Sequence, residues 1–422
     1  MRRPSLRLSG GLAETGIAIL SFGGSSVYWL ALAFAMSPAA YGAMMTLQAA
    51  VLIVVMIFTF RTHDLFFNLI AKHGLSADVA YRRTLKIELA AGAAGALICT
   101  LIALASEPTG GGWVGAAGFA AFALLASLGV IHGASIGKLR YLTRNDVISR
   151  TDVLTALGWV AACASIPLIY RQSAIVPLIV GSVPPAMRTL ALFISVRRVL
   201  PRRDAATSGE APAVEVGSGQ ILRFLAGAQV TNFIKNGAVS IETLILAAFT
   251  PPPVVAMFRV ARAAQGASNA ALNVAYQRSY PILARATDGA ERLAAARRLG
   301  VRSFWICCAI YPLAVLASLA YALFKPEIGV IELQLLTLGT FLTLLPGGAL
   351  QQGSIALLLI DGDHRSVGTA YLLSLMALGL TALAMAALPR VEVFVAGLIG
   401  AALLRMWYLN RRSHKVAMAR SA

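Results

Sequence analysis

The chain has 422 residues, of which 58% are hydrophobic and only 13% are charged, and its mean hydropathy is +0.75. This balance excludes an ordinary soluble domain and predicts an all-α, polytopic membrane protein. The net charge of +18 does not indicate nucleic-acid binding, because the Lys and Arg residues stand between long apolar runs and form no basic patch interleaved with aromatic residues. The four cysteines lie inside apolar stretches and lack the spacing of a disulfide framework or a zinc site.

The first apolar run follows Arg2, Arg3 and Arg7, an arrangement that resembles the start of a signal peptide. This run, residues 12–36, is too long for one, and Glu14 interrupts its beginning. We therefore expect an uncleaved first membrane span.

Twelve apolar runs are long enough to cross a bilayer core of about 30 Å at a rise of about 1.5 Å per residue. The first six are residues 12–36, 40–60 or beyond, 87–105, 113–137, 147–170 and 174–196. The second six are residues 221–249, 254–280, 301–324, 331–360, 367–388 and 393–409.

Residues 201–220 form a polar stretch with little to bury, which predicts a cytoplasmic linker between two six-helix lobes, residues 1–200 and 221–422. Six spans return the chain to its starting side, so the lobes are expected to be repeats about a pseudo-two-fold axis along the membrane normal. Direct support comes from residues 33–45, which align with residues 247–259 and share with them a turn that contains proline.

Positive charge predicts the orientation, since cytoplasmic loops are rich in Lys and Arg. With both termini in the cytoplasm, only Arg171, Lys325 and Arg390 fall outside. Five cations lie within apolar segments and need another explanation: Arg61, Arg188, Lys235, Arg259 and Arg262. The basic segment 285–302 is expected to bind anionic membrane lipids.

The predicted span at residues 254–280 carries a polar stripe, because residues three or four apart share one face of a helix. Its members are Arg259, Arg262, Gln265, Asn269, Asn273, Tyr276, Gln277 and Tyr280. Polar groups at this depth must face protein or water, so the stripe predicts a substrate pathway. Hydrogen bonding between packed helices is the alternative.

Depth along the seventh and eighth spans places Glu242 level with Arg259 and predicts that they pair. Arg262 and Lys235 then remain to bind an anionic group, with Arg188 closer to the cytoplasm. A structural ion pair is the alternative for Lys235 and Glu242.

Other residues bear on motion and ion coupling. Pro184 and Pro185 in the sixth span, and Pro346 and Gly347 in the tenth, predict hinges or tolerated kinks. Three acidic residues are candidates for coupling to protons or sodium: Glu14, Asp64 and Glu242. The trio Arg61, His63 and Asp64 is also consistent with a position at the membrane surface, and His132 with a packed histidine.

Two segments resemble the polysaccharide transporter family, in the superfamily that also holds lipid-linked oligosaccharide flippases and multidrug and toxin extrusion transporters. Residues 37–42 (SPAAYG) resemble its GPxxYG turn, and residues 241–262 its DxxLLGxFLGPxxVGxYxxAxR pattern. Glu242 replaces the Asp of that pattern, Phe258 its Tyr, and Arg259 adds a charge.

The resemblance implies a flippase in a bacterial cytoplasmic (inner) membrane. Its substrate would be a polyprenyl-pyrophosphate-linked precursor of O-antigen, capsule or exopolysaccharide, exported by alternating access. Its partners would include a polysaccharide polymerase and chain-length proteins. The same superfamily leaves a drug or anion antiporter as an alternative.

Catalysis finds little support, since the sequence contains no nucleophile elbow, phosphate-binding loop, metal-ligand cluster or paired carboxylates. We therefore expect no enzymatic activity, metal or cofactor. A major facilitator transporter is disfavoured because residues 72–86 match that family's loop pattern only weakly. A membrane-embedded polymerase or glycosyltransferase is disfavoured because every predicted external loop is short.

Overall fold

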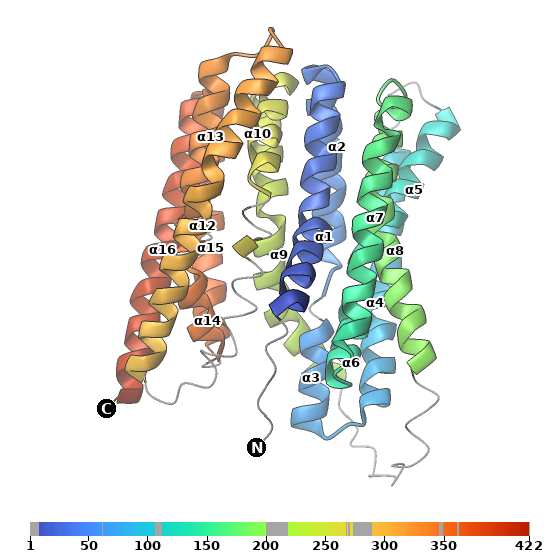
Figure 1. The fold of residues 1–422 in the computed structure, drawn as a ribbon, viewed down its shortest axis with the longest axis vertical. Helices are drawn as coiled ribbons and strands as arrows, with labels where there is room; N and C mark the ends of the chain where they lie inside the picture. Colours follow the sequence, from blue (N-terminus) through green and yellow to red (C-terminus); the bar gives the residue numbers. More distant parts are fainter. Residues whose placement is uncertain are drawn as a thin grey trace. The chain divides into compact units, whose positions relative to one another are not determined.

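The computed structural model describes residues 8–421 except 61, 106–111, 200–217, 267, 269–270, 273–288, 346–348 and 361–362. The chain forms two compact units, Met1–Ser21 with Gln48–Gly237, and Phe22–Leu47 with Ala238–Ala422. Each unit is a set of packed helices (Figure 1).

The described residues before position 200 form eight helices. They are α1 (Leu8–Ala35), α2 (Pro38–Ile57), α3 (Thr62–His73), α4 (Ala77–Ala105), α5 (Gly112–Val130), α6 (Gly133–Tyr141), α7 (Asn145–Ile169) and α8 (Ile175–Val199). The long helices of the first unit lie side by side in Figure 1, with α8 packed against α5 and α7.

In the second half of the chain, α16 packs against α12, α13, α14 and α15. The helices here are α9 (Ser218–Phe249), α10 (Pro252–Ala264), α12 (Gly289–Phe324), α13 (Val330–Leu344), α14 (Gln352–Ile360), α15 (His364–Ala387) and α16 (Val391–Ser421).

Among the described residues, eight helical segments are long and apolar enough to cross a membrane, and two shorter apolar helices accompany them. Large apolar side chains cover their outer faces: Leu168 is 75% exposed, Leu323 84% and Ile331 85%. Apolar exposure on this scale is unfavourable in water and suits contact with lipid.

The two compact units do not coincide with the two predicted lobes, because two segments belong to the other unit. Phe22–Leu47 belongs to the second unit, where the Phe34 ring lies 5.4 Å from the Tyr321 ring. The start of α9 belongs to the first unit, where Gln229 Nε2 donates to the Met56 carbonyl at 2.8 Å. The predicted linker lies almost wholly outside the described residues and stays a prediction.

Local signals explain where α2 and α10 begin. The Ser37 hydroxyl accepts a hydrogen bond from the Ala40 N–H, and Pro38 occupies the first helical position, where its missing N–H costs nothing. Pro252 likewise occupies the first helical position of α10, which has no side-chain cap. The aligned repeat segments therefore end one helix and start the next at matching positions, Ala35 with Phe249 and Pro38 with Pro252.

These two turns contact each other inside the second unit. A Cβ added at Gly42 would collide with the carbonyl oxygen of Pro252, which is backbone and has little room to move. Gly42, the last residue of the SPAAYG motif, is thus required for the close approach of α2 to the start of α10.

Gly42→Ala should therefore lower the free energy of unfolding by about 1–3 kcal/mol, because the added methyl group overpacks a rigid contact. Thermal unfolding of the purified protein measures the loss. Gly379→Ala is the matched control, because a Cβ there meets nothing within 4 Å and alanine favours a helix. Equal unfolding temperatures for the two variants would contradict the contact.

Four predicted spans are shorter or divided in the described structure. The second ends at Ile57, and a separate helix, α3, follows it. The fourth is divided into α5 and α6, and the tenth into α13 and α14. In the eighth, predicted at residues 254–280, helix α10 ends at Ala264.

Candidate functional site

The second unit contains a buried ion pair in the region of the predicted polar stripe. Glu242 on α9 pairs with Arg262 on α10, and their side chains are only 10% and 17% exposed. Arg262 also donates to the Thr343 hydroxyl at 3.4 Å, and its guanidinium lies 5.4 Å from the centre of the Phe258 ring. The Arg262 side chain therefore has three partners: a carboxylate, a hydroxyl and an aromatic ring.

This pairing corrects the prediction that Arg262 remains available for an anionic group. Arg259 and Arg262 are three residues apart on one face of α10, about 4.5 Å along its axis, so a carboxylate placed level with one can reach the other. Arg259 lies within electrostatic reach of Tyr41 on α2, of Arg262 and of Glu242, and its predicted pairing with Glu242 stays a prediction. The three charges form one network inside the second unit.

Gln265 ends α10 and is almost fully buried. Its Nε2 donates to the Thr340 hydroxyl at 2.6 Å and to the Thr337 carbonyl at 3.2 Å, both on α13. For this residue the structure favours the alternative, a hydrogen bond between packed helices. Its Oε1 has no hydrogen-bond partner among the described residues.

The rest of the predicted pathway lies outside the described part of the chain. Asn269, Asn273 and Gln277 are not described, and Lys235 lies on α9 with an undescribed side chain. Their part in a pathway stays a prediction.

In the first unit, Arg188 also has a carboxylate partner. Its Nε and Nη2 atoms lie 2.9 and 2.8 Å from Asp152 Oδ1 on α7, and both side chains are about one-seventh exposed or less. This contact, in which two nitrogens share one oxygen, links α7 to α8. Asp152 was missed as a partner although it lies in a predicted span.

The proline pair Pro184 and Pro185 lies inside α8, which runs unbroken from Ile175 to Val199. The two rings pack against the glycines Gly158 on α7 and Gly129 on α5. Tight packing of this kind explains how α8 tolerates the prolines. Pro346 and Gly347 lie outside the described residues, between Leu345 and Ala349, so the hinge there stays a prediction.

A second buried carboxylate, Glu88 on α4, was not among the predicted site residues. Its Oε1 accepts from the Thr62 hydroxyl and from the Ala134 N–H at 3.0 Å. The Gly133 N–H faces it as well. Glu88 thus places a carboxyl group at the N-terminus of α6, where a helix favours negative charge.

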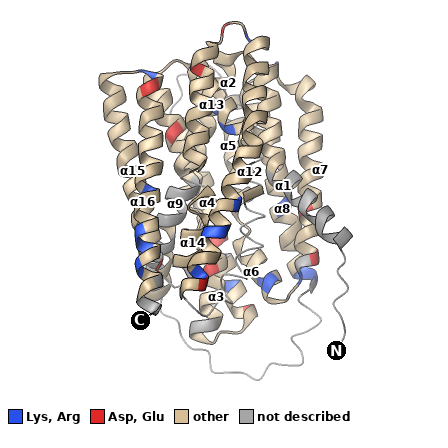
Figure 2. Cartoon of the chain, turned by 60° about the vertical axis from the view of Figure 1, so that its left-hand side comes forward, with Lys and Arg blue, Asp and Glu red and all other residues tan. Residues whose placement is uncertain are grey.

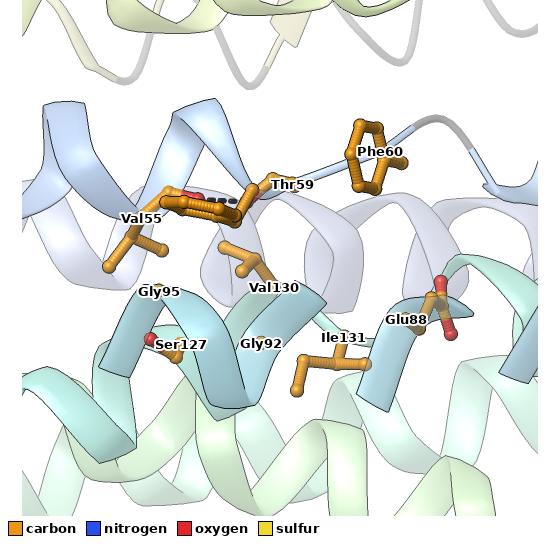
Figure 3. A pocket seen from close by; sticks show the side chains of 10 residues that line it. Val55, Thr59, Phe60, Glu88, Gly92, Gly95, Ser127, Val130 and Ile131 are labelled. Carbon is orange, nitrogen blue, oxygen red and sulfur yellow. Dashed lines mark hydrogen bonds between the residues drawn. The ribbon is translucent and has the colours of Figure 1, made fainter. Parts of the chain in front are cut away.

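The other oxygen of Glu88, Oε2, is buried and has no hydrogen-bond partner among the described residues. Glu88 lies at one end of a narrow pocket lined also by Thr59, Phe60 and Ser127 (Figure 3). The pocket offers about 10 Å³ to water, which is room for about one molecule. It fits a proton, a water molecule or a small cation, and it excludes a drug or a sugar.

The predicted coupling residues have different outcomes. Asp64 lies 2.8 Å from His63, and both side chains are about one-third exposed, as expected near a surface. Glu242 is paired with Arg262. The side chain of Glu14 lies outside the description. His132 is held at the start of α6, where its Nδ1 lies 3.2 Å from the Gly129 carbonyl, as a packed histidine would be.

Among the described residues, no group of three His, Cys, Asp or Glu side chains is placed to hold a metal ion. The candidate site therefore consists of two buried acid-centred clusters, one in each unit. The Glu88 cluster contains Thr62 and the start of α6, and the Glu242 cluster contains Arg259, Arg262 and Thr343.

Comparison with known proteins gives a match at the level of structure. No protein-family model matches the sequence, and no curated protein does. A multidrug resistance MATE family transporter of the MOP superfamily, in an inward-facing conformation, matches over 96% of both chains at 14% identity, with a TM-score of 0.61. The chain has the MATE transporter fold.

An outward-facing structure of such a transporter matches over 96% of this chain and 95% of the other, at 13% identity and a TM-score of 0.58. A MOP superfamily transporter from Pyrococcus furiosus matches at 13% identity over 97% and 95% of the chains, with a TM-score of 0.51. The reversed polarity of its binding pocket is described as suggesting a different function. At these identities the likeness shows the fold of a polytopic, all-α membrane protein.

Proposed function

We propose that the chain is a membrane transporter of the MOP superfamily that works by alternating access. The observation that carries the proposal is likeness over nearly the whole length to both inward-facing and outward-facing MATE structures. The absence of any nucleotide-binding motif in the sequence favours a transporter driven by an ion gradient over one driven by ATP. A location in the bacterial inner membrane, with both termini in the cytoplasm, is part of the proposal.

For the substrate, we propose a small organic molecule, as in the drug or anion antiporter alternative. A large anionic substrate would be favoured by unneutralised cations within the membrane. Arg188 is paired with Asp152, and Arg262 with Glu242, so two of those five cations are already neutralised. The MATE structures it resembles are named for multidrug resistance.

A lipid-linked oligosaccharide is the second candidate substrate. It is supported by the SPAAYG motif and the residue 241–262 pattern, whose turns match in the structure. Arg259 adds charge to the Glu242 cluster, so that cluster keeps one more arginine than acid among its three named charges. Polysaccharide polymerase and chain-length proteins would be partners only under this second proposal.

We also propose Glu88 as the group that couples transport to an ion. A carboxylate at membrane depth is costly, which makes it a functional candidate by default. Glu88 keeps one buried oxygen without a hydrogen-bond partner, and its pocket admits little more than one water molecule. Glu242, in contrast, is paired with an arginine.

Cells in which the gene is deleted or overexpressed distinguish the two substrates. Overexpression should lower ethidium accumulation in a strain without other drug pumps, and deletion should leave surface polysaccharide unchanged. Protein abundance in the membrane is measured in the same cells. Loss of surface polysaccharide with no change in ethidium would reject the small-molecule proposal and support the oligosaccharide.

A further inference from the structure

A groove in the second unit lies among α12, α14 and α16, and none of its lining residues belongs to the Glu242 cluster. Its volume is about 370 Å³, enough for a small polar head group. Residues from all three helices and the turn before α14 line it: Leu293, Ala296, Arg297, Gly300, Val301, Leu350, Ser354, Met406, Asn410, Ser413 and His414.

The lining changes from polar to apolar along the helices. On α12, Arg297 is followed one turn later by Val301, and on α16, His414 and Asn410 are preceded by Met406. The exposed indoles of Trp305 (65%) and Trp407 (55%) follow on the apolar side. Exposed tryptophans of membrane proteins are enriched at the interface between lipid and water, so the groove lies at that level.

The polar end of the groove is basic. Arg297 and His414 line it, and none of the described lining residues carries a carboxylate. Figure 2 shows Lys and Arg residues gathered along the C-terminal part of α16. The acid Asp363 lies 3.7 Å from Arg412, and neither residue lines the groove. The groove therefore favours an anion.

The wall of the groove holds hydrogen-bonding side chains in place. The Ser413 hydroxyl donates to Ser354, and the Ser354 hydroxyl donates to Asn410 Oδ1, at 3.2 and 2.8 Å. The side-chain oxygen of Asn410 accepts this hydrogen bond, so the two N–H groups of the same side chain remain as donors. Gly353 lets α14 approach the Ala296 carbonyl of α12, where a Cβ would collide.

We propose that this groove binds the phosphate of an anionic phospholipid. Arg297 and the Asn410 amide donate to the phosphate oxygens, and His414 adds polar contact at the same end. The lipid's glycerol and upper acyl chains lie along Val301 and Met406, beside the two tryptophans. The inference goes beyond transport and does not depend on which substrate is moved.

The test uses the purified full-length protein in neutral detergent, with thermal unfolding and native mass spectrometry as readouts. Phosphatidylglycerol should raise the unfolding temperature and stay bound, phosphatidylcholine should do neither, and inorganic phosphate should have a much smaller effect. Arg297→Ala and Asn410→Leu should each weaken phosphatidylglycerol binding roughly tenfold, because each removes a donor to the phosphate. Arg390→Ala, an exposed cation just before the other end of α16, is the matched control.

Affinities are compared only between variants whose unfolding temperatures without lipid equal that of the natural protein. Equal binding of phosphatidylcholine, or wild-type affinity in both groove variants, would overturn the proposal. Inorganic phosphate as effective as phosphatidylglycerol would overturn the assignment to a lipid and leave a free anion as the occupant.

Discussion

Glu242→Gln should lower the free energy of unfolding by about 3–5 kcal/mol, because it leaves the charge of Arg262 buried without its partner. Arg262→Gln should lower the free energy of unfolding by a similar amount, because it leaves the Glu242 carboxylate buried without its partner. The double variant should recover most of the loss, since neither charge is then left alone. Thermal or denaturant unfolding of the three variants gives the coupling energy of the pair.

The exposed pair Arg144 and Asp146 is the control. Its side chains are 42% and 49% exposed, so Asp146→Asn should cost less than about 1 kcal/mol. The account of the pair would be wrong if Glu242→Gln were as stable as Asp146→Asn. It would also be wrong if the losses of the two single variants simply added in the double variant.

Glu88→Ala should lower the free energy of unfolding by about 3 kcal/mol, because Thr62 and the Ala134 N–H lose a charged acceptor in a buried site. Glu88→Gln keeps an acceptor oxygen of the same shape and should cost only about 1 kcal/mol, for the lost charge at the start of α6. Unfolding of both variants separates the hydrogen bonds from the charge.

Glu332→Ala is the matched control for Glu88, because Glu332 is exposed in the first turn of α13 and should cost at most about 1 kcal/mol. The coupling proposal adds a readout that packing alone would not change. Folded Glu88→Gln protein should move substrate down a gradient but no longer respond to an imposed ion gradient. A normal ion response in Glu88→Gln would remove Glu88 from the coupling step.

Much of the fold follows from hydrophobic length. The predicted seventh span, residues 221–249, and the ninth and eleventh lie within α9, α12 and α15 or within one residue of them. The division of the fourth span was missed because residues 113–137 contain no charged residue and are mostly apolar. The break near His132 is stabilised by Glu88, a residue distant in sequence. Periodicity along one segment carries no information about such a contact.

The ion pairs were harder to predict than the helices. Counting residues from the membrane surface gives the depth of the backbone but not the reach of a long side chain, so the pairing of Arg262 with Glu242 was not predicted. Glu88 was not predicted as a site residue, although it lies at the start of the predicted third span, residues 87–105. Only the folded arrangement shows that Thr62 and Ala134, far from it in sequence, enclose its carboxylate.

Counterflow in proteoliposomes tests the central claim, that the chain is a carrier working by alternating access, most directly. The purified protein is reconstituted, and uptake of labelled substrate is measured with and without the unlabelled substrate inside. Ethidium and a soluble analogue of the polyprenyl-pyrophosphate oligosaccharide are tested separately. We expect unlabelled substrate inside to accelerate uptake of one of the two. Flux without such acceleration, as through a channel, or no protein-dependent flux of either would contradict the account.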